Sequence, residues 1–254
     1  MKKVLAFDID QTLNVAKTPI TDEIAELLVR CLDHFAICPI SGQKFDQFLI
    51  QIVNRLKNPT PAQLENLHLF VAQGTQYYRY NTAKNDWEQV YNYPLTAEQV
   101  KKITETMEQA AKELGFWYAD QLDEGDEIIE NRLSQVTFSA LGQKAGTSEK
   151  YDWDPDLKKR TKIVARCKEL SPEFEYEIGG TTSINAITPG MNKEFGMNHL
   201  LEELGVEKSD VLYFGDMTMP GGNDYPIVKM GIDTITVRSH EDTAFALRGI
   251  LGVL

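Results

Sequence analysis

Residues 3–13 read KVLAFDIDQTL, and this stretch decides the expected fold class. The apolar run of residues 3–7 is typical of a buried parallel strand, because a strand covered on both faces has no polar face. Asp8 and Asp10 follow it directly, at the strand end where open α/β sheets bind ligands. One carboxylate there could attack phosphorus while the other, two residues on, donates and accepts protons. The same pattern also fits an ordinary acidic turn.

Strand and helix patterns alternate on either side of this stretch. Thr21, with acids at Asp22 and Glu23, predicts a helix start, because the hydroxyl caps free N–H groups and the acids face the helix dipole. We predict further strands at residues 36–40, 67–72, 211–214 and 234–237, and further helices at 45–55 and 194–204. This alternation predicts an α/β protein whose Rossmannoid core, a parallel sheet with helices, comprises residues 1–81 and 187–254.

The regular alternation of strand and helix patterns stops in the middle of the chain. Residues 76–80 and 87–91 flank a polar turn and predict an antiparallel hairpin. Thr96 and Gln99 have capping-box spacing, which predicts another helix start. Strands at 136–141 and 174–178 bracket a helix at 155–170, with Pro155 at its first position. We therefore predict that residues 82–186 form an inserted α/β domain with a mixed or antiparallel sheet.

The amino-acid composition and net charge argue against several classes of function. The 254 residues are 42% hydrophobic and 25% charged, as in ordinary globular proteins. The net charge of −12 disfavours a nucleic-acid partner, since such proteins carry a basic footprint. No apolar run approaches the ~20 residues of a membrane-spanning helix, so no membrane partner is expected. The three cysteines show no close pair, which fits reduced thiols and a cytoplasmic location.

Two further segments have residues suited to phosphate. Ser41 and Gly42 end the second predicted strand and precede a helix, where a hydroxyl and backbone N–H groups could grip a phosphoryl group. Lys193 precedes a later helix and could neutralise phosphate charge. Taken alone, the first pair fits a plain helix cap and the lysine fits a solvated side chain.

The fourth segment offers oxygen ligands for a metal ion. Asp216 follows the strand at 211–214, and a glycine-rich turn brings Asn223 and Asp224 back towards it. Carboxylates and carbonyls are the ligands that Mg²⁺ prefers. An isolated loop of this kind could be only a tight turn, but four such segments in this order argue against coincidence.

The four segments together resemble the haloacid dehalogenase (HAD) superfamily of aspartate-nucleophile phosphotransferases. Within it, the chain is similar to the eukaryotic-type phosphomannomutases and related sugar phosphatases, whose large α/β cap is of type IIB. The likeness runs through most of the chain and is strongest in residues 179–185 and 215–224.

This resemblance implies roles for particular residues. Asp8 would be the nucleophile and Asp10 the acid/base. Ser41, Gly42 and Lys193 would bind phosphate. Mg²⁺ would be held by Asp8, the Asp10 carbonyl and Asp216, with Asn223 and Asp224 supporting those ligands.

The chain also departs from the family pattern. Gln11 stands where glycine is usual, so the catalytic turn could differ. In the cap, Arg132 and Ser183 match sugar- and phosphate-binding positions, whereas Gln143 and Lys150 replace arginines and Asn185 replaces an aspartate. Lys17 stands where the mutases have another arginine. Lysine and glutamine replace bidentate arginine poorly at a phosphate site.

These substitutions favour a Mg²⁺-dependent phosphatase of sugar phosphates or similar small phosphorylated metabolites. The alternative is a phosphomannomutase that interconverts mannose 1-phosphate and mannose 6-phosphate. A non-catalytic sugar-phosphate-binding protein is a third hypothesis, disfavoured because both Asp8 and Asp10 are present. The expected partner is a small phosphorylated metabolite, and a homodimer is left open.

Overall fold

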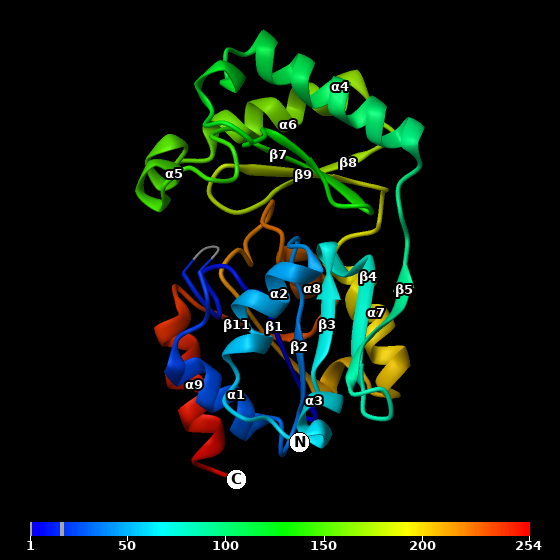
Figure 1. The fold of residues 1–254 in the computed structure, drawn as a ribbon, viewed down its shortest axis with the longest axis vertical. Coiled ribbons are helices and arrows are strands. Elements are labelled where there is room, and N and C mark those ends of the chain that lie inside the picture. Colours follow the sequence, from blue (N-terminus) through cyan, green and yellow to red (C-terminus); the bar gives the residue numbers. More distant parts are fainter. Residues whose placement is uncertain (1, 16–17) are drawn as a thin grey trace. The chain divides into compact units, whose positions relative to one another are not determined.

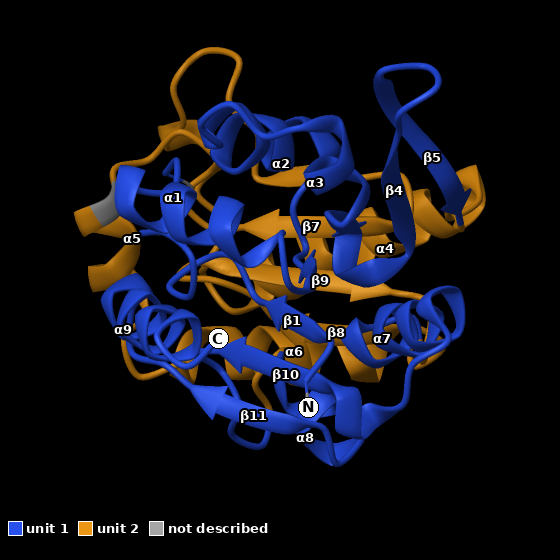
Figure 2. Ribbon diagram, turned by 90° about the horizontal axis from the view of Figure 1, so that it is seen from below, with its two compact units in different colours: residues 1–92, 191–220, 224–254 blue, residues 93–190, 221–223 orange. Residues whose placement is uncertain are grey.

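The computed structural model describes residues 2–15 and 18–254, so Lys17 lies outside the described residues. The chain divides into two compact units (Figure 2). Unit 1 comprises residues 1–92, 191–220 and 224–254, and unit 2 comprises residues 93–190 and 221–223. The boundaries expected from sequence lay at 81/82 and 186/187, whereas the main divisions fall at 92/93 and 190/191.

Unit 1 is built on a parallel sheet with strand order β11-β10-β1-β2 (Figure 1). The strands are β1 (Val4–Phe7), β2 (Ala36–Pro39), β10 (Val211–Gly215) and β11 (Asp233–Thr236). Parallel bridges join the β2 segment to the segment of β3 (His68–Val71). The predicted α/β class with a parallel core sheet is confirmed.

Helices cover both faces of this sheet. Leu5 and Phe7 of β1 pack into a cluster with α1 (Asp22–Cys31) and α9 (His240–Leu251). Val4 and Ala6 point the other way and pack with α7 (Lys193–Leu204) and α8 (Tyr225–Lys229). Because successive side chains of a strand alternate between faces, an entirely apolar strand requires this three-layer arrangement.

The first helix, α1, begins and packs as its sequence predicts. The Thr21 hydroxyl accepts a hydrogen bond from the Ile24 N–H at 3.3 Å, and the apolar stripe of α1 is buried. The predicted helix at 45–55 is present as α2 (Phe45–Gln51) followed by a short 3₁₀ turn, η1 (Val53–Arg55). The remaining short helices of unit 1 are α3 (Pro61–Glu65), η2 (Ala72–Gly74) and η4 (Lys208–Asp210).

The predicted hairpin consists of β4 (Gln76–Asn81) and β5 (Asp86–Asn92). β4 also pairs with β3, so the sheet β3-β4-β5 belongs wholly to unit 1. A boundary at residue 82 would have divided paired strands. Hydrogen bonding across the hairpin therefore explains why unit 1 extends to residue 92.

Unit 2 is a two-layer α/β structure with an antiparallel sheet of order β6-β7-β9-β8. Its strands are β6 (Ile129–Asn131), β7 (Gln135–Ser139), β8 (Glu175–Ile178) and β9 (Ser183–Ile187). Apolar residues of β7 and β9 pack against α4 (Ala97–Glu113) and α6 (Lys158–Leu170). The capping box expected at Thr96 is present. Two short helices, η3 (Ala119–Gln121) and α5 (Thr147–Trp153), complete unit 2.

The predicted start of the second long cap helix was wrong. Pro155 does not occupy its first position, because α5 ends before it and α6 begins at Lys158. The Asp154 carboxylate accepts hydrogen bonds from the N–H groups of Lys159 and Arg160, at 2.9 and 3.1 Å. These bonds satisfy donors of the first turn, so a side chain upstream of the proline sets the start.

None of the helices formed by residues 2–15 and 18–254 combines the length and apolar character that crossing a bilayer requires.

Candidate active site

The segments singled out in the sequence meet at the carboxyl edge of the unit 1 sheet. In the strand register, Phe7 of β1 lies opposite Pro39 of β2 and Phe214 of β10. The Asp8 N–H donates to the Phe214 carbonyl at 2.9 Å, which continues this pairing by one residue. Residues that follow β1, β2 and β10 therefore leave the sheet at the same edge, as parallel strands require.

Lys193 joins two of these segments. It opens α7 and is completely buried, and its ammonium donates to Asp8 Oδ1 at 2.5 Å and Asp224 Oδ1 at 2.6 Å. Although burial lowers the pKa of Lys193, Asp224 and Asp8 raise it, and the result lies above the usual lysine value. Lys193 therefore remains charged and holds Asp8 and Asp224 together.

Asp224 has partners on both oxygens. The Tyr213 hydroxyl donates to Oδ1 at 2.5 Å, and the Met217 N–H donates to Oδ2 at 3.0 Å. Gly215 makes room for this carboxylate, since a Cβ there would lie 2.5 Å from Asp224 Oδ2. Asp224 thus acts as an anchor that fixes Lys193 and the turn after β10.

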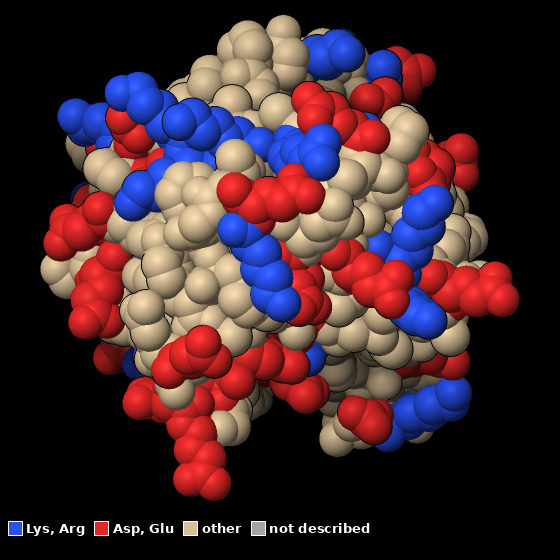
Figure 3. Space-filling view, turned by 90° about the horizontal axis from the view of Figure 1, so that it is seen from above, with Lys and Arg blue, Asp and Glu red and all other residues tan. Residues whose placement is uncertain are grey.

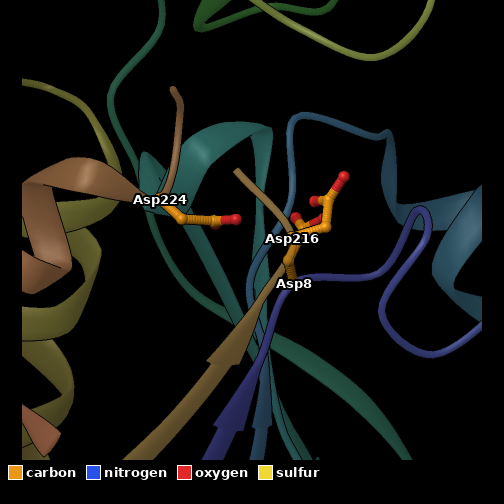
Figure 4. A group of neighbouring side chains, drawn as sticks. All are labelled: Asp8, Asp216 and Asp224. Carbon is orange, nitrogen blue, oxygen red and sulfur yellow. The ribbon is translucent and has the colours of Figure 1, made fainter. Parts of the chain in front are cut away.

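Asp8, Asp216 and Asp224 form a cluster of carboxylates (Figure 4). One oxygen from each lies within 4.8 Å of the others. Burial raises the pKa of Asp216 to about 7, the Asp224 charge adds to this rise, and Lys193 opposes it. Burial likewise raises the pKa of Asp8 well above its usual value, against the lowering effect of Lys193. A hard divalent cation fits this donor set, because it favours the charged carboxylates that burial disfavours.

Asp10 is half-buried, one turn beyond the strand, and its Oδ1 accepts a hydrogen bond from Gln43 Nε2 at 3.0 Å. Gln11 follows with a φ of 65°, in the left-handed region that favours glycine. Its N–H donates to the Asn14 carbonyl at 2.9 Å. The turn therefore adopts a glycine-like conformation although it contains glutamine.

Ser41 and Gly42 lie in the loop between β2 and α2, at the same sheet edge as Asp8. Ser41 is buried, and its N–H donates to the Phe70 carbonyl at 3.1 Å. Because that N–H is already paired, the side-chain hydroxyl of Ser41 is the group suited to contact phosphate.

Asn223 directly precedes Asp224 in the chain. Its amide oxygen is buried and finds no donor among residues 2–15 and 18–254. A buried acceptor without a donor is costly, so this oxygen is suited to a group that the protein does not itself provide. Metal-bound water is one such donor.

The predicted cap residues lie in unit 2 and are engaged within it. The Arg132 guanidinium pairs with Glu130 at 2.6 Å, with both side chains largely buried. The Lys150 ammonium donates to the Gln143 carbonyl at 2.7 Å. Two of the cationic groups expected at the cap therefore have partners from unit 2 itself.

The sheet face of unit 2 opposite the helices is polar. Asn185 accepts hydrogen bonds from Thr137 at 2.9 Å and from Gln135 at 3.3 Å. Ser183 pairs in register with Ser139 on the same face. The residues flanking the Thr137–Asn185 pair across the sheet are Glu130 and Glu177. This face therefore presents hydroxyls, amides and carboxylates.

The molecular surface shows no basic footprint on the face in Figure 3, where positive and negative side chains intermingle. On α4, ion pairs such as Lys101–Glu105 and Lys112–Glu108 have this mixed character.

Two residues of the site were not singled out from the sequence, namely Tyr213 and Gln43. Tyr213 lies in a strand predicted to be buried and apolar. Its hydroxyl could have indicated a role in the site, because a buried tyrosine hydroxyl needs a hydrogen-bond partner. Nothing in the sequence around Gln43 indicates a role in the site, because its contact with Asp10 depends on how a loop from a neighbouring strand folds.

Comparisons with known proteins agree with this geometry. The family model described as eukaryotic phosphomannomutase matches residues 63–253. Phosphomannomutase 2 of Dictyostelium discoideum is 26% identical over 250 residues, covering 94% of this chain and 93% of the relative. The phosphomannomutase of Saccharomyces cerevisiae is 25% identical, covering 88% and 84%.

Solved structures share the fold. IMP-bound, N-terminally truncated IMP-nucleotidase of Plasmodium falciparum has a TM-score of 0.72 at 14% identity, over 99% of this chain and 68% of the other. A haloacid dehalogenase-like hydrolase of Bacteroides thetaiotaomicron has a TM-score of 0.62 at 16% identity, over 98% and 100%. At such identities the likeness concerns the fold alone. Because the family model matches most of its length, the chain belongs to the eukaryotic phosphomannomutase family.

Proposed function

We propose that the chain is a Mg²⁺-dependent phosphomutase acting on mannose phosphate or a closely similar hexose phosphate. The observation that carries the chemistry is the buried Lys193, which bridges Asp8 and Asp224 beside Asp216 at the sheet edge. Membership of the phosphomannomutase family supports the hexose phosphate as substrate and the mutase reaction.

In the first step Asp8 attacks phosphorus. The new bond joins a carboxylate oxygen to phosphorus, the bond from phosphorus to the sugar oxygen breaks, and an aspartyl-phosphate results. Lys193 holds Asp8 Oδ1, which limits rotation of the carboxylate and favours its charged form. Ser41, Gly42 and Lys193 are the groups suited to hold the phosphoryl oxygens.

Asp10 serves as acid and then as base. It gives a proton to the departing sugar oxygen, which would otherwise leave as an alkoxide. In the second step it takes a proton from the acceptor hydroxyl that receives the phosphoryl group. In a mutase that acceptor is a free hydroxyl of a hexose monophosphate, which thereby becomes a bisphosphate. The bisphosphate then turns round and returns its other phosphoryl group to Asp8.

The metal-binding role falls to Asp8, the main-chain carbonyl of Asp10 and Asp216. Asp224 and Asn223 support these ligands, since both Asp224 oxygens already accept hydrogen bonds within the protein. A Mg²⁺ ion held by these residues would supply positive charge that offsets the charge of the carboxylates and of the phosphate.

A second candidate is a phosphatase of sugar phosphates, in which water is the acceptor. The observation that favours it is that two cationic side chains expected to bind the second phosphate already have partners within unit 2. Arg132 pairs with Glu130, and the Lys150 ammonium donates to the Gln143 carbonyl. A mutase must hold a second phosphate, and cations with protein partners do this less well than free arginine forks.

The test separates the two products. The protein is incubated with Mg²⁺, mannose 1-phosphate and a hexose bisphosphate activator, and mannose 6-phosphate and inorganic phosphate are measured separately. We expect mannose 6-phosphate to form faster than phosphate, and Asp8→Asn to abolish both products. Predominant phosphate release would favour the phosphatase, whereas unchanged activity in Asp8→Asn would refute the aspartyl-phosphate mechanism.

A further inference from the structure

We propose that Gln43 is a positioning residue for Asp10, holding its carboxyl group in the orientation that protonates the departing sugar oxygen. The inference rests on the proposed function, because it assigns Gln43 a part in the acid step performed by Asp10. It concerns a residue outside the four motif segments.

The contact itself has a fixed polarity. Gln43 Nε2 lies 3.0 Å from Asp10 Oδ1, and Gln43 is 6% exposed. An ionised carboxylate only accepts hydrogen bonds, so the amide must present its NH₂ group to Asp10. This bond restricts rotation of the Asp10 carboxyl group, while Asp10 itself remains half-buried.

The backbone around Gln43 is anchored to a different strand from the one that carries Asp10. The Ala72 N–H donates to the Gln43 carbonyl at 3.1 Å, and the Gln73 N–H donates to the Ser41 carbonyl at 2.9 Å. The Ser41 N–H completes the connection through the Phe70 carbonyl at 3.1 Å. The Gln43 side chain therefore extends from a loop fixed to the end of β3 and reaches a carboxylate fixed to the end of β1.

A purely structural role does not explain this side chain. Its other polar atom, Oε1, is buried and has no donor among the residues that the structure describes. Leaving a buried acceptor unpaired destabilises a fold, and an apolar side chain of similar volume would avoid that cost. The clear contribution of the Gln43 side chain at this position is therefore its hydrogen bond to Asp10.

This role predicts a dependence on the leaving group. When phosphorus moves from a sugar oxygen to Asp8, the sugar oxygen needs a proton from Asp10 as the bond breaks. When acetyl phosphate is the donor, acetate leaves as a stable anion and needs no proton. Losing the correct orientation of Asp10 should therefore slow the first reaction much more than the second.

The test compares how fast a hexose bisphosphate and acetyl phosphate phosphorylate Asp8, as second-order rate constants from single turnovers of the full chain with Mg²⁺. These rate constants cover only the steps up to phosphorylation of Asp8, so the later use of Asp10 as a base does not enter. Gln43→Met keeps the approximate volume without a donor, and Gln43→Leu is a second apolar variant without a donor. In both we expect a loss of about 10–100-fold with the hexose bisphosphate and of less than about 3-fold with acetyl phosphate, because positioned acid catalysis contributes about 10²–10⁴-fold.

Gln63→Met is the matched control. Gln63 donates through its amide to the Val29 carbonyl and to Asp33, near the amino end of β3 rather than the carboxyl edge. The control should leave the ratio of the two rate constants unchanged. In addition, Gln43→Met should melt no lower than the wild type, since it removes the unpaired Oε1.

Two results would overturn the inference: equal losses with both phosphate donors, or a melting temperature that falls in step with activity. A wild-type protein inactive with both donors would instead refute the proposed function, and the inference with it.

Discussion

Replacing Lys193 with methionine should destabilise unit 1 strongly and in a pH-dependent way. The substitution keeps an unbranched side chain of similar length but removes the ammonium group. In the folded protein this group lies 2.5 Å from Asp8 Oδ1 and 2.6 Å from Asp224 Oδ1, and Lys193 is fully buried. Methionine leaves both carboxylates buried without their cation.

The magnitude follows from that burial. Removing one partner of a buried ion pair costs about 3–5 kcal/mol, because the remaining charge stays desolvated. Here two carboxylates lose the same partner, while Tyr213 and Met217 still donate to Asp224. We therefore expect a loss of about 4–5 kcal/mol in the free energy of unfolding near pH 8, in chelator.

The loss should shrink in acid. Burial already raises the pKa of Asp8 above its unfolded value, and removing Lys193 removes the charge that opposes this rise. The folded variant then binds protons that the unfolded chain does not, so its stability increases as pH falls towards the unfolded carboxyl pKa. At about pH 5 we expect the difference from the wild type to fall to roughly half of its value at pH 8.

Urea unfolding at the two pH values, followed by circular dichroism and by hydrogen exchange of β1 and β10, measures this effect. Lys84→Met serves as the control, because Lys84 pairs with Glu88 on the exposed β4–β5 hairpin. Exposed ion pairs contribute little, so the control should unfold as the wild type does. Full stability of Lys193→Met at pH 8, or an equal loss at both pH values, would refute the reasoning.

Three further predictions concern other parts of the structure. Gln11→Gly should keep the free energy of unfolding within about 1 kcal/mol, whereas Gln11→Val should lose about 1–3 kcal/mol in denaturant titrations, because φ is 65°. Arg160→Met should lose about 3–5 kcal/mol and speed hydrogen exchange in residues 179–183, because Arg160 pairs with buried Asp154 and donates to the carbonyls of Gly179 and Gly180. In chelator, stability should fall as pH rises from about 4 to about 7, because the folded pKa of Asp216 is about 7. Thermal melts of Asp216→Asn should show a smaller fall, since Asp8 still contributes to it, and no Mg²⁺-dependent shift.

The core could be predicted from sequence because its signals are local. Leu5 and Phe7 face one helical layer and Val4 and Ala6 the other, so an apolar run was sufficient to indicate a buried parallel strand. Once parallel strands are assigned, the shared edge follows, and residues just after β1, β2 and β10 must lie near one another.

The second unit was harder to predict because its boundaries depend on pairing between distant segments. The β4–β5 hairpin was predicted, but the expected boundary at residue 82 divided it. β5 belongs to unit 1 because it pairs with β4, which in turn pairs with β3. The start of α6 depends on the Asp154 carboxylate, which competes with the usual signal of a proline at the first position. β9, between two regions that were recognised, was not expected as a strand at all.

The side-chain network of the site was beyond sequence reasoning for a related reason. Lys193 was expected to contact phosphate, and the structure gives it two carboxylate partners as well. Such pairing depends on the side-chain directions at the ends of three separate elements, which composition and spacing do not specify. The family pattern supplied the residue types, and packing determined which oxygen each of them contacts.

Charge at the site explains why phosphate and cation should bind together. The carboxylates of Asp8, Asp216 and Asp224 lie within reach of one another, and Lys193 is the cation that pairs with two of them. A phosphate dianion brought to this cluster meets a net negative charge, since one ammonium does not balance three carboxylates. Protonating the carboxylates would relieve the repulsion but would disable the nucleophile that we propose at Asp8, because a neutral carboxyl group attacks phosphorus poorly. A divalent cation relieves it while keeping Asp8 ionised, so binding of metal and of phosphate should each strengthen the other.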